Sequence, residues 1–181
     1  MYKKRLSNLY LLIRKGQLFF ILMGFMAMIS PSSVLADKTG EHLPQNILGM
    51  ELQKVISGEE AAKIINRMHQ GDVATHSDYI AEYKGNAGSA TYYLSLYESP
   101  CQAAQAMKDM ARVMKKQGHG FSHFMQRAHK NISFYMALGQ GQAHYFYANG
   151  IELVWLAVDK AVAEQAIMEL LQKTTDQDDS E

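Results

Sequence analysis

The sequence contains a single cysteine, Cys101, among its 181 residues. One thiol excludes an intramolecular disulfide and every zinc or haem motif that needs two or more cysteines. In an oxidising compartment a lone thiol is either buried and inert or available for intermolecular chemistry. Cys101 lies in the first turn of a predicted helix, where the partial positive charge favours a thiolate. It is therefore a candidate reactive thiol, but we favour the interpretation of Cys101 as a half-buried small apolar residue.

Common hydrolase motifs are also missing. The sequence has no Gly-x-Ser-x-Gly and no His-Glu-x-x-His, and no paired carboxylates that predict a catalytic cleft. The glycine-containing segment 139–142 links two predicted strands, so it lacks the strand-to-helix context of a phosphate-binding loop. These absences favour a protein without catalytic activity.

Acidic residues are absent from the start of the chain. No Asp or Glu precedes Asp37, whereas five Lys and Arg lie there, followed by an apolar run of 12 residues and small residues up to Ala36. This order predicts a secretory signal peptide over residues 1–36, cleaved before Asp37. An uncleaved anchor is the alternative, although a spanning helix needs about 20 apolar residues. We expect a periplasmic or secreted protein that contacts a membrane only through this segment, if it is uncleaved.

The charge balance changes when the signal is removed. Cleavage leaves 13 of the 18 Lys and Arg against all 18 Asp and Glu, a net charge of about −5. Basic residues are scattered along the remaining chain, so nucleic acid is not an expected partner. The remaining length is that of one domain. We expect an irregular lead-in over residues 37–56, an α+β domain over 57–173 and a disordered acidic tail over 174–181.

Helix and turn signals divide the predicted domain into elements. A capping box at Ser57 starts a helix that ends before Gly71. Ser99, Pro100 and Gln102 start the longest helix, which Gly118 ends. Asp159 is expected to cap a final helix. Alternating or apolar segments predict strands at 78–84, 89–97, 121–128, 132–138, 143–148 and 151–158.

These elements predict the fold class. Hairpins connect most of the strands, which argues against a Rossmann-type nucleotide fold. Two strand-strand-helix units plus an extra hairpin give an antiparallel sheet of about six strands, and the helices are expected to pack on one face.

Three histidines and a methionine cluster in one short segment, at His119, His123, Met125 and His129. Such residues in an exported protein suggest a copper or zinc site. In a strand, however, His119 and His123 lie ~13 Å apart, too far for one ion, and only His123 and Met125, ~6.6 Å apart, can converge. The sequence alone therefore predicts at most half a metal site.

The turn between the strands at 121–128 and 132–138 decides which way these histidines face. A two-residue loop, Lys130-Asn131, pairs His129 with Ile132, and a three-residue loop pairs Ala128 with Ile132. We favour the longer loop because it gives a consistent apolar face, and a one-residue slip moves every side chain to the opposite face.

The last predicted strand is apolar on both faces. A two-residue Asn149-Gly150 turn would place His144 opposite the only tryptophan, Trp155. Helices on one side would leave Val154 and Leu156 uncovered, next to Tyr145 and Tyr147. Such a surface must meet a second layer of the chain, a protein partner, a like subunit in a homo-dimer, or a small apolar ligand, and we expect one of the last three. The function that we expect is thus an exported binding or accessory module, with copper or zinc handling as the alternative. The residues assigned to the binding surface are Tyr145, Tyr147, Val154, Leu156, His144 and Trp155.

Overall fold

The computed structural model describes residues 42–69, 74–116 and 120–178, which form eight strands, three α-helices and one 3-10 helix. The predicted signal peptide at residues 1–36 lies outside them. The elements are β1 (Asn46–Ile47), β2 (Met50–Ser57), α2 (Gly58–His69), β3 (Ser77–Gly85), β4 (Gly88–Leu96), α3 (Pro100–Met114), β5 (Phe121–His129), β6 (Ile132–Gly139), β7 (Gln142–Asn149), β8 (Glu152–Asp159), η1 (Lys160–Val162) and α4 (Ala163–Asp178).

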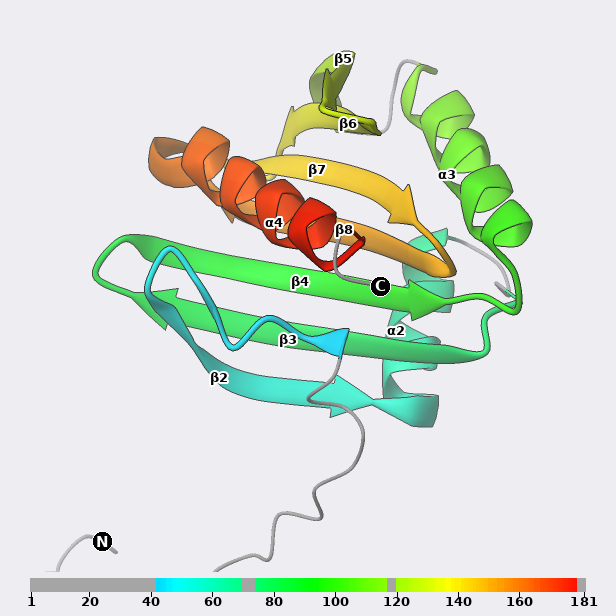
Figure 1. Cartoon of the computed structure of the whole chain (residues 1–181), viewed down its shortest axis with the longest axis horizontal. Helices are drawn as coiled ribbons and strands as arrows, with labels where there is room; N and C mark the ends of the chain where they lie inside the picture. The colour runs from blue at the N-terminus through cyan, green and yellow to red at the C-terminus, as the bar shows by residue number, and fades with distance from the viewer. Residues whose placement is uncertain (1–41, 70–73, 117–119, 179–181) are drawn as a thin grey trace, which may run out of the picture. The chain divides into compact units, whose positions relative to one another are not determined.

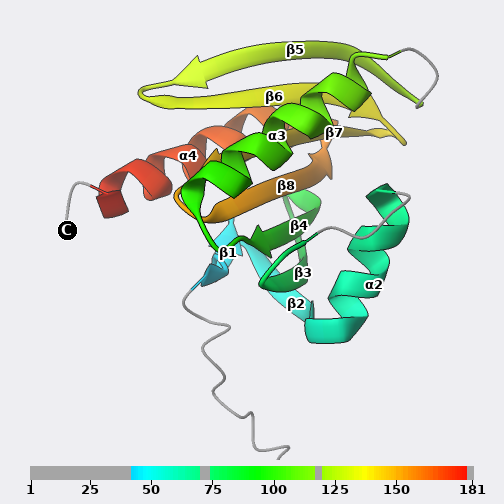
Figure 2. The ribbon, with the colours of Figure 1, turned by 90° about the vertical axis from the view of Figure 1, so that its right-hand side faces the viewer.

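The described strands form one antiparallel sheet in the order β1-β2-β3-β4-β8-β7-β6-β5. Strands β1 to β4 form one meander and strands β5 to β8 another, and the meanders join where β4 pairs with β8. The sheet bends into a half-barrel (Figure 2). The α+β class and the antiparallel sheet are confirmed, but the sheet has eight described strands rather than about six.

The additional strands lie in the segment 37–56, which the sequence predicts to be irregular. β2 pairs with β3 from Glu51 to Ser57, with a bulge between Leu52 and Lys54. A bulge inserts one extra residue and breaks the alternation of apolar and polar positions. The strand was missed because that alternation is the main sequence signal for a half-buried strand.

Helices cover both faces of the sheet, so the expectation of helices on one face is wrong. Figures 1 and 2 show α4 and α2 on opposite faces. We call the two sides the α4 face and the α2–α3 face. Because β8 lies between the two layers, its apolar side chains are covered on both sides.

The α4 face holds the larger core. Tyr145, Tyr147, Val154 and Leu156 are all buried there, together with apolar residues of α4 and of residues 43–50. The leading segment and α4 are joined by a hydrogen bond from the Leu48 amide to Glu169. The predicted open tyrosine-rich surface is therefore wrong, since the chain covers these four residues with its own C-terminal helix and leading segment.

The α2–α3 face carries two smaller clusters. Ile65 of α2 packs on Ile80 and Tyr93. The predicted apolar stripe of α3 packs on β6, β7 and β8, and its residues are Ala103, Met107, Met110, Ala111 and Met114. The Ser99 hydroxyl accepts a hydrogen bond from the Gln102 amide at 3.4 Å, which confirms the predicted N-cap.

The start of the last helix differs from the prediction. The Asp159 side chain makes no cap hydrogen bond, and η1 precedes α4. Asp159 instead accepts hydrogen bonds from the Ser89 amide and hydroxyl, at 2.8 and 3.0 Å. The residue therefore joins the end of β8 to the β3–β4 hairpin.

The predicted disordered tail at 174–181 is partly helical, because α4 continues to Asp178. Thr175 is buried and accepts a hydrogen bond from Lys130. Residues 179–181 lie outside the described part of the chain.

Candidate functional site

A row of aromatic side chains crosses the α2–α3 face from strand to strand. Ring centroids are 5.3 Å apart for Phe124 and Tyr135, 5.1 Å for Tyr135 and Phe146, and 5.6 Å for Phe146 and Trp155, all nearly parallel or tilted by less than 25°. Trp155 stands directly opposite Tyr93 in the β8–β4 pairing, so the row continues across the join between the meanders. These five residues are called the aromatic row below.

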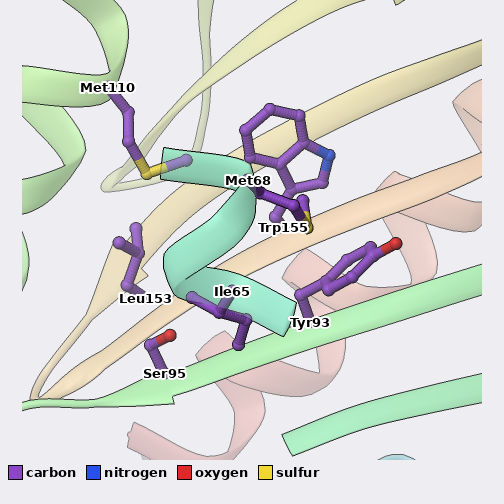
Figure 3. A pocket seen from close by; sticks show the side chains of 7 residues that line it. All are labelled: Ile65, Met68, Tyr93, Ser95, Met110, Leu153 and Trp155. Atoms are coloured by element: carbon purple, nitrogen blue, oxygen red, sulfur yellow. The ribbon is translucent and has the colours of Figure 1, made fainter. Parts of the chain in front are cut away.

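The two helices on this face cover opposite ends of the row. α3 packs over Tyr135 and Phe146, and α2 packs over Ile80 beside Tyr93. A cleft opens between the helices, above the central strands β4 and β8 (Figure 3). The residues that line it are Ile65, Met68, Tyr93, Ser95, Met110, Leu153 and Trp155.

The cleft is narrow and almost entirely apolar. Its free volume is about 20 Å³, which is roughly the space of one water molecule. Met68 lies at the rim of the cleft and is 45% exposed. The side-chain oxygens in the lining are those of Ser95 and Tyr93. The Tyr93 pKa is raised, first by burial and then by the charge of Glu82. As it stands, the cleft has room for one group of about the size of a water molecule, and a longer apolar ligand requires movement of the lining side chains.

A buried carboxylate lies behind Ser95. The Ser95 hydroxyl donates to Asp78 Oδ1 at 2.6 Å, and the Thr75 hydroxyl donates to Asp78 Oδ2 at 2.6 Å. Asp78 is 3% exposed and Ser95 7%. Both bonds have the short length of hydrogen bonds to an ionised carboxylate. The hydroxyl hydrogen of Ser95 therefore points to Asp78, and the Ser95 oxygen remains free to accept a hydrogen bond.

His144 fixes the orientation of Trp155. The Trp155 indole N–H donates to His144 Nδ1 at 3.0 Å, and His144 Nε2–H donates to the Gly139 carbonyl at 3.0 Å. The Phe121 ring packs edge-on against the imidazole at 4.9 Å. Burial lowers the His144 pKa, and the hydrogen bond to Gly139 opposes this in part. His144 therefore holds the indole as a neutral imidazole with a defined tautomer.

The predicted neighbours His144 and Trp155 are in contact, although the predicted strand register is wrong by two residues. His144 pairs with Ala157, and Phe146 pairs with Trp155, because the turn consists of Gly150 and Ile151. A slip of two residues keeps every side chain on the same face. The contact therefore survives as a diagonal pair instead of a direct one.

The preferred register of the β5–β6 hairpin is wrong as well. His129 pairs with Ile132, so the loop is the two-residue Lys130-Asn131 turn. A bulge between Ser122 and Met125 adds one residue, and His123 adopts a positive φ of 54° there. The bulge reverses the faces halfway along β5 and so conceals the register in the sequence pattern.

The bulge also separates the residues predicted to bind metal. The His123 side chain is exposed and hydrogen-bonded to the Ser122 hydroxyl. Met125 is 43% exposed beyond the bulge, and His129 lies at the far end of β5. His119 lies outside the described residues. Within the described part of the chain, no group of three or more His, Cys, Asp or Glu is placed to hold a metal ion.

Cys101 lies in the first turn of α3, as predicted, and is exposed. The half-buried position that we favour from the sequence is therefore wrong. None of the residues that line the cleft is Cys101, so a reactive thiol there would be a separate feature.

Sequence reasoning found Trp155 and His144 but missed Tyr93, Ser95 and Asp78. Alternation in β4 does place Tyr93 and Ser95 on one face. Their approach to Trp155 and Leu153, however, depends on the pairing of β4 with β8, whose partners lie about 60 residues apart in the sequence. No local pattern carries that information.

Comparison with protein-family models, with curated proteins and with solved structures finds no match for this chain. No helix in the described residues is long and apolar enough to cross a membrane. The functional argument therefore rests on the geometry of the site.

Proposed function

We propose that this protein is a small exported, non-catalytic binding module that holds a small apolar ligand in the cleft between α2 and α3. The observation that carries the proposal is the opening between the two helices above Trp155 and Tyr93. Elsewhere the aromatic row is covered by α3, whereas both rings line the cleft. Small-molecule sites are typically concave and apolar with a few oriented polar groups, and this cleft has that composition.

The walls are suited to adjustment around a ligand. Met68 of α2 and Met110 of α3 both line the cleft (Figure 3). Methionine is unbranched and polarisable, so it adapts to ligands of different shape at low cost. A ligand larger than the present free volume would enter by rearranging these two side chains.

Export is the second part of the proposal, and it rests on residues 1–36 of the sequence. We expect the mature protein to begin at Asp37 in a periplasmic or secreted form. Intact-mass measurement of protein recovered from its own host tests this. A mass that retains residues 1–36 on membrane-bound protein would contradict cleavage and support an anchor.

The binding site can be tested through the only tryptophan. Trp155 gives a single indole N–H signal in a ¹H–¹⁵N spectrum, and this ring lines the cleft while its N–H donates to His144. We expect n-butanol, as a slim apolar probe, to shift the signal in a saturable manner. Loss of saturation, or a shift no larger than that of surface amides, would contradict the proposal.

Two matched variants locate the effect. Met68→Lys places a charge at the rim of the cleft, and Met125→Lys makes the same change at a similarly exposed site on β5 (45% and 43% exposed). We expect Met68→Lys to weaken butanol binding about tenfold or more, because the charge must be desolvated or displaced from the cleft. Met125→Lys should leave binding unchanged.

A further inference from the structure

We propose that the ligand carries an ammonium group on its slim apolar body, and that this group donates to the Ser95 hydroxyl oxygen at the floor of the cleft. The inference rests on the proposed function, because it names the ligand class for the same cleft. Its basis is the polar network beneath the apolar walls, formed by Ser95, Asp78 and Thr75.

The first step is the orientation of Ser95. Its hydrogen is donated to Asp78 Oδ1 at 2.6 Å, so the oxygen can only accept further hydrogen bonds. Ser95 is more than nine-tenths buried, and it lines the cleft. A hydroxyl that already donates to a carboxylate is polarised and becomes a stronger acceptor. The floor of the cleft therefore selects a ligand with a hydrogen-bond donor.

The second step concerns charge. Asp78 is almost fully buried, and within the described residues none of the ion pairs includes it. Its two partners there are neutral hydroxyls. Buried carboxylates are normally paired with a cation, because an isolated buried charge is costly. The negative charge also reaches Tyr97, whose pKa is raised to about 12 by burial and by Asp78. A cation at Ser95 would compensate the charge through one intervening hydroxyl.

The third step is the character of the walls. Trp155 and Tyr93 line the cleft, and the face of an aromatic ring attracts a nearby cation. The apolar side chains around them suit an aliphatic body. An ammonium group with a short alkyl chain satisfies the rings, the apolar walls and the Ser95–Asp78 pair together.

The size of the opening favours a free amine over the lysine of a protein partner. A stable protein interface buries roughly 800 Å² on each partner. Among the residues that line the cleft, Met68 is the one exposed large apolar side chain. The rim therefore offers little apolar surface to a macromolecule.

The test compares n-butylammonium chloride with n-butanol, which has the same chain and a neutral donor. The Trp155 indole signal reports both titrations, with sodium chloride added to match ionic strength. We expect butylammonium to bind about tenfold more tightly or better, since hydrogen bonds involving a charge are the stronger ones. Nα-acetyl-lysine amide should bind more weakly than butylammonium; tighter binding would overturn the assignment to a free amine.

Three substitutions probe the network. Ser95→Ala and Asp78→Asn should each abolish the preference for the amine, so that butylammonium and butanol bind with about equal affinity. Thr75→Val is the control, because it removes the other hydrogen bond to Asp78 from a residue that does not line the cleft, and the preference should remain. If Asp78→Asn does not fold, Ser95→Ala alone decides the question.

The possible results separate this inference from the proposed function. Saturable butanol binding without a preference for the amine, or a preference that survives Ser95→Ala, overturns the ammonium assignment only. A Trp155 signal that responds to neither probe overturns both proposals.

Discussion

At the scale of single residues, His144 is held in one protonation state. Its Nδ1 accepts from the Trp155 indole and its Nε2–H donates to Gly139. A proton added to Nδ1 would face another donor, and the surrounding Phe121 ring provides no countercharge. The lowered pKa of His144, caused first by burial, follows from this environment.

This arrangement predicts a pH-dependent stability. The unfolded chain binds a proton at His144 near the ordinary pKa of 6.5, before the folded protein does. The contribution of His144 is therefore complete above pH 6.5 and is lost as the pH falls below it. Urea denaturation from pH 8 to pH 5 should show decreasing stability of the wild type.

His144→Gln provides the control for the six other histidines. Glutamine can accept from the indole and donate to Gly139, but it does not titrate. The variant should lose less stability between pH 8 and pH 5 than the wild type. Equal losses in the two proteins would show that His144 does not cause the pH dependence.

At the scale of elements, the sequence predicts a helix start or a hairpin correctly where all the residues that determine it are close together in the chain. The Ser99 cap of α3 and the pairing of the predicted strands at 78–84 and 89–97 depend on residues close together in the sequence, and both are confirmed. The bulges in β2 and β5 disrupt the two-residue period on which strand prediction depends. As a result β2 was missed and β5 was assigned the wrong register.

The bulge in β5 makes a prediction with a defined sign. His123 has a φ of 54°, a conformation that glycine adopts more easily than other residues. His123→Gly should therefore leave the protein equally stable or raise the free energy of unfolding by up to ~1 kcal/mol. In a regular strand the same change would be destabilising by roughly 0.5–1 kcal/mol.

Ser122→Gly is the matched control in that experiment, because Ser122 is an exposed neighbour that keeps its pairing with Leu138. Chemical denaturation of both variants gives the comparison. A destabilisation of His123→Gly as large as that of Ser122→Gly would contradict the bulge and restore the three-residue loop.

At the scale of the whole molecule, the sequence identified β8 as apolar on both faces but did not determine what covers it. A helix that follows an antiparallel strand can return over either face of the sheet, and its own apolar stripe does not indicate which. Here α4 covers Val154 and Leu156, and α3 covers Leu153. Four residues of the predicted surface, Tyr145, Tyr147, Val154 and Leu156, consequently lie in the core, whereas Trp155 lines the cleft on the opposite face.

The role of α4 predicts a large stability effect. Ile167 is fully buried in the core of the α4 face. Ile167→Ala should cost about 2–5 kcal/mol of unfolding free energy, because it leaves a cavity. Val113→Ala, at a 48% exposed position of α3, should cost less than about 0.5 kcal/mol. Similar small effects of both changes would contradict the packing of α4 on the sheet.

The central claim is that the cleft between α2 and α3 binds a slim apolar group against Trp155. Intermolecular nuclear Overhauser effects from the n-butanol chain test its location directly. The account predicts signals to the Trp155 indole and to the Met68 methyl group. Effects confined to exposed apolar residues outside the cleft, such as Val113 and Met125, would contradict it.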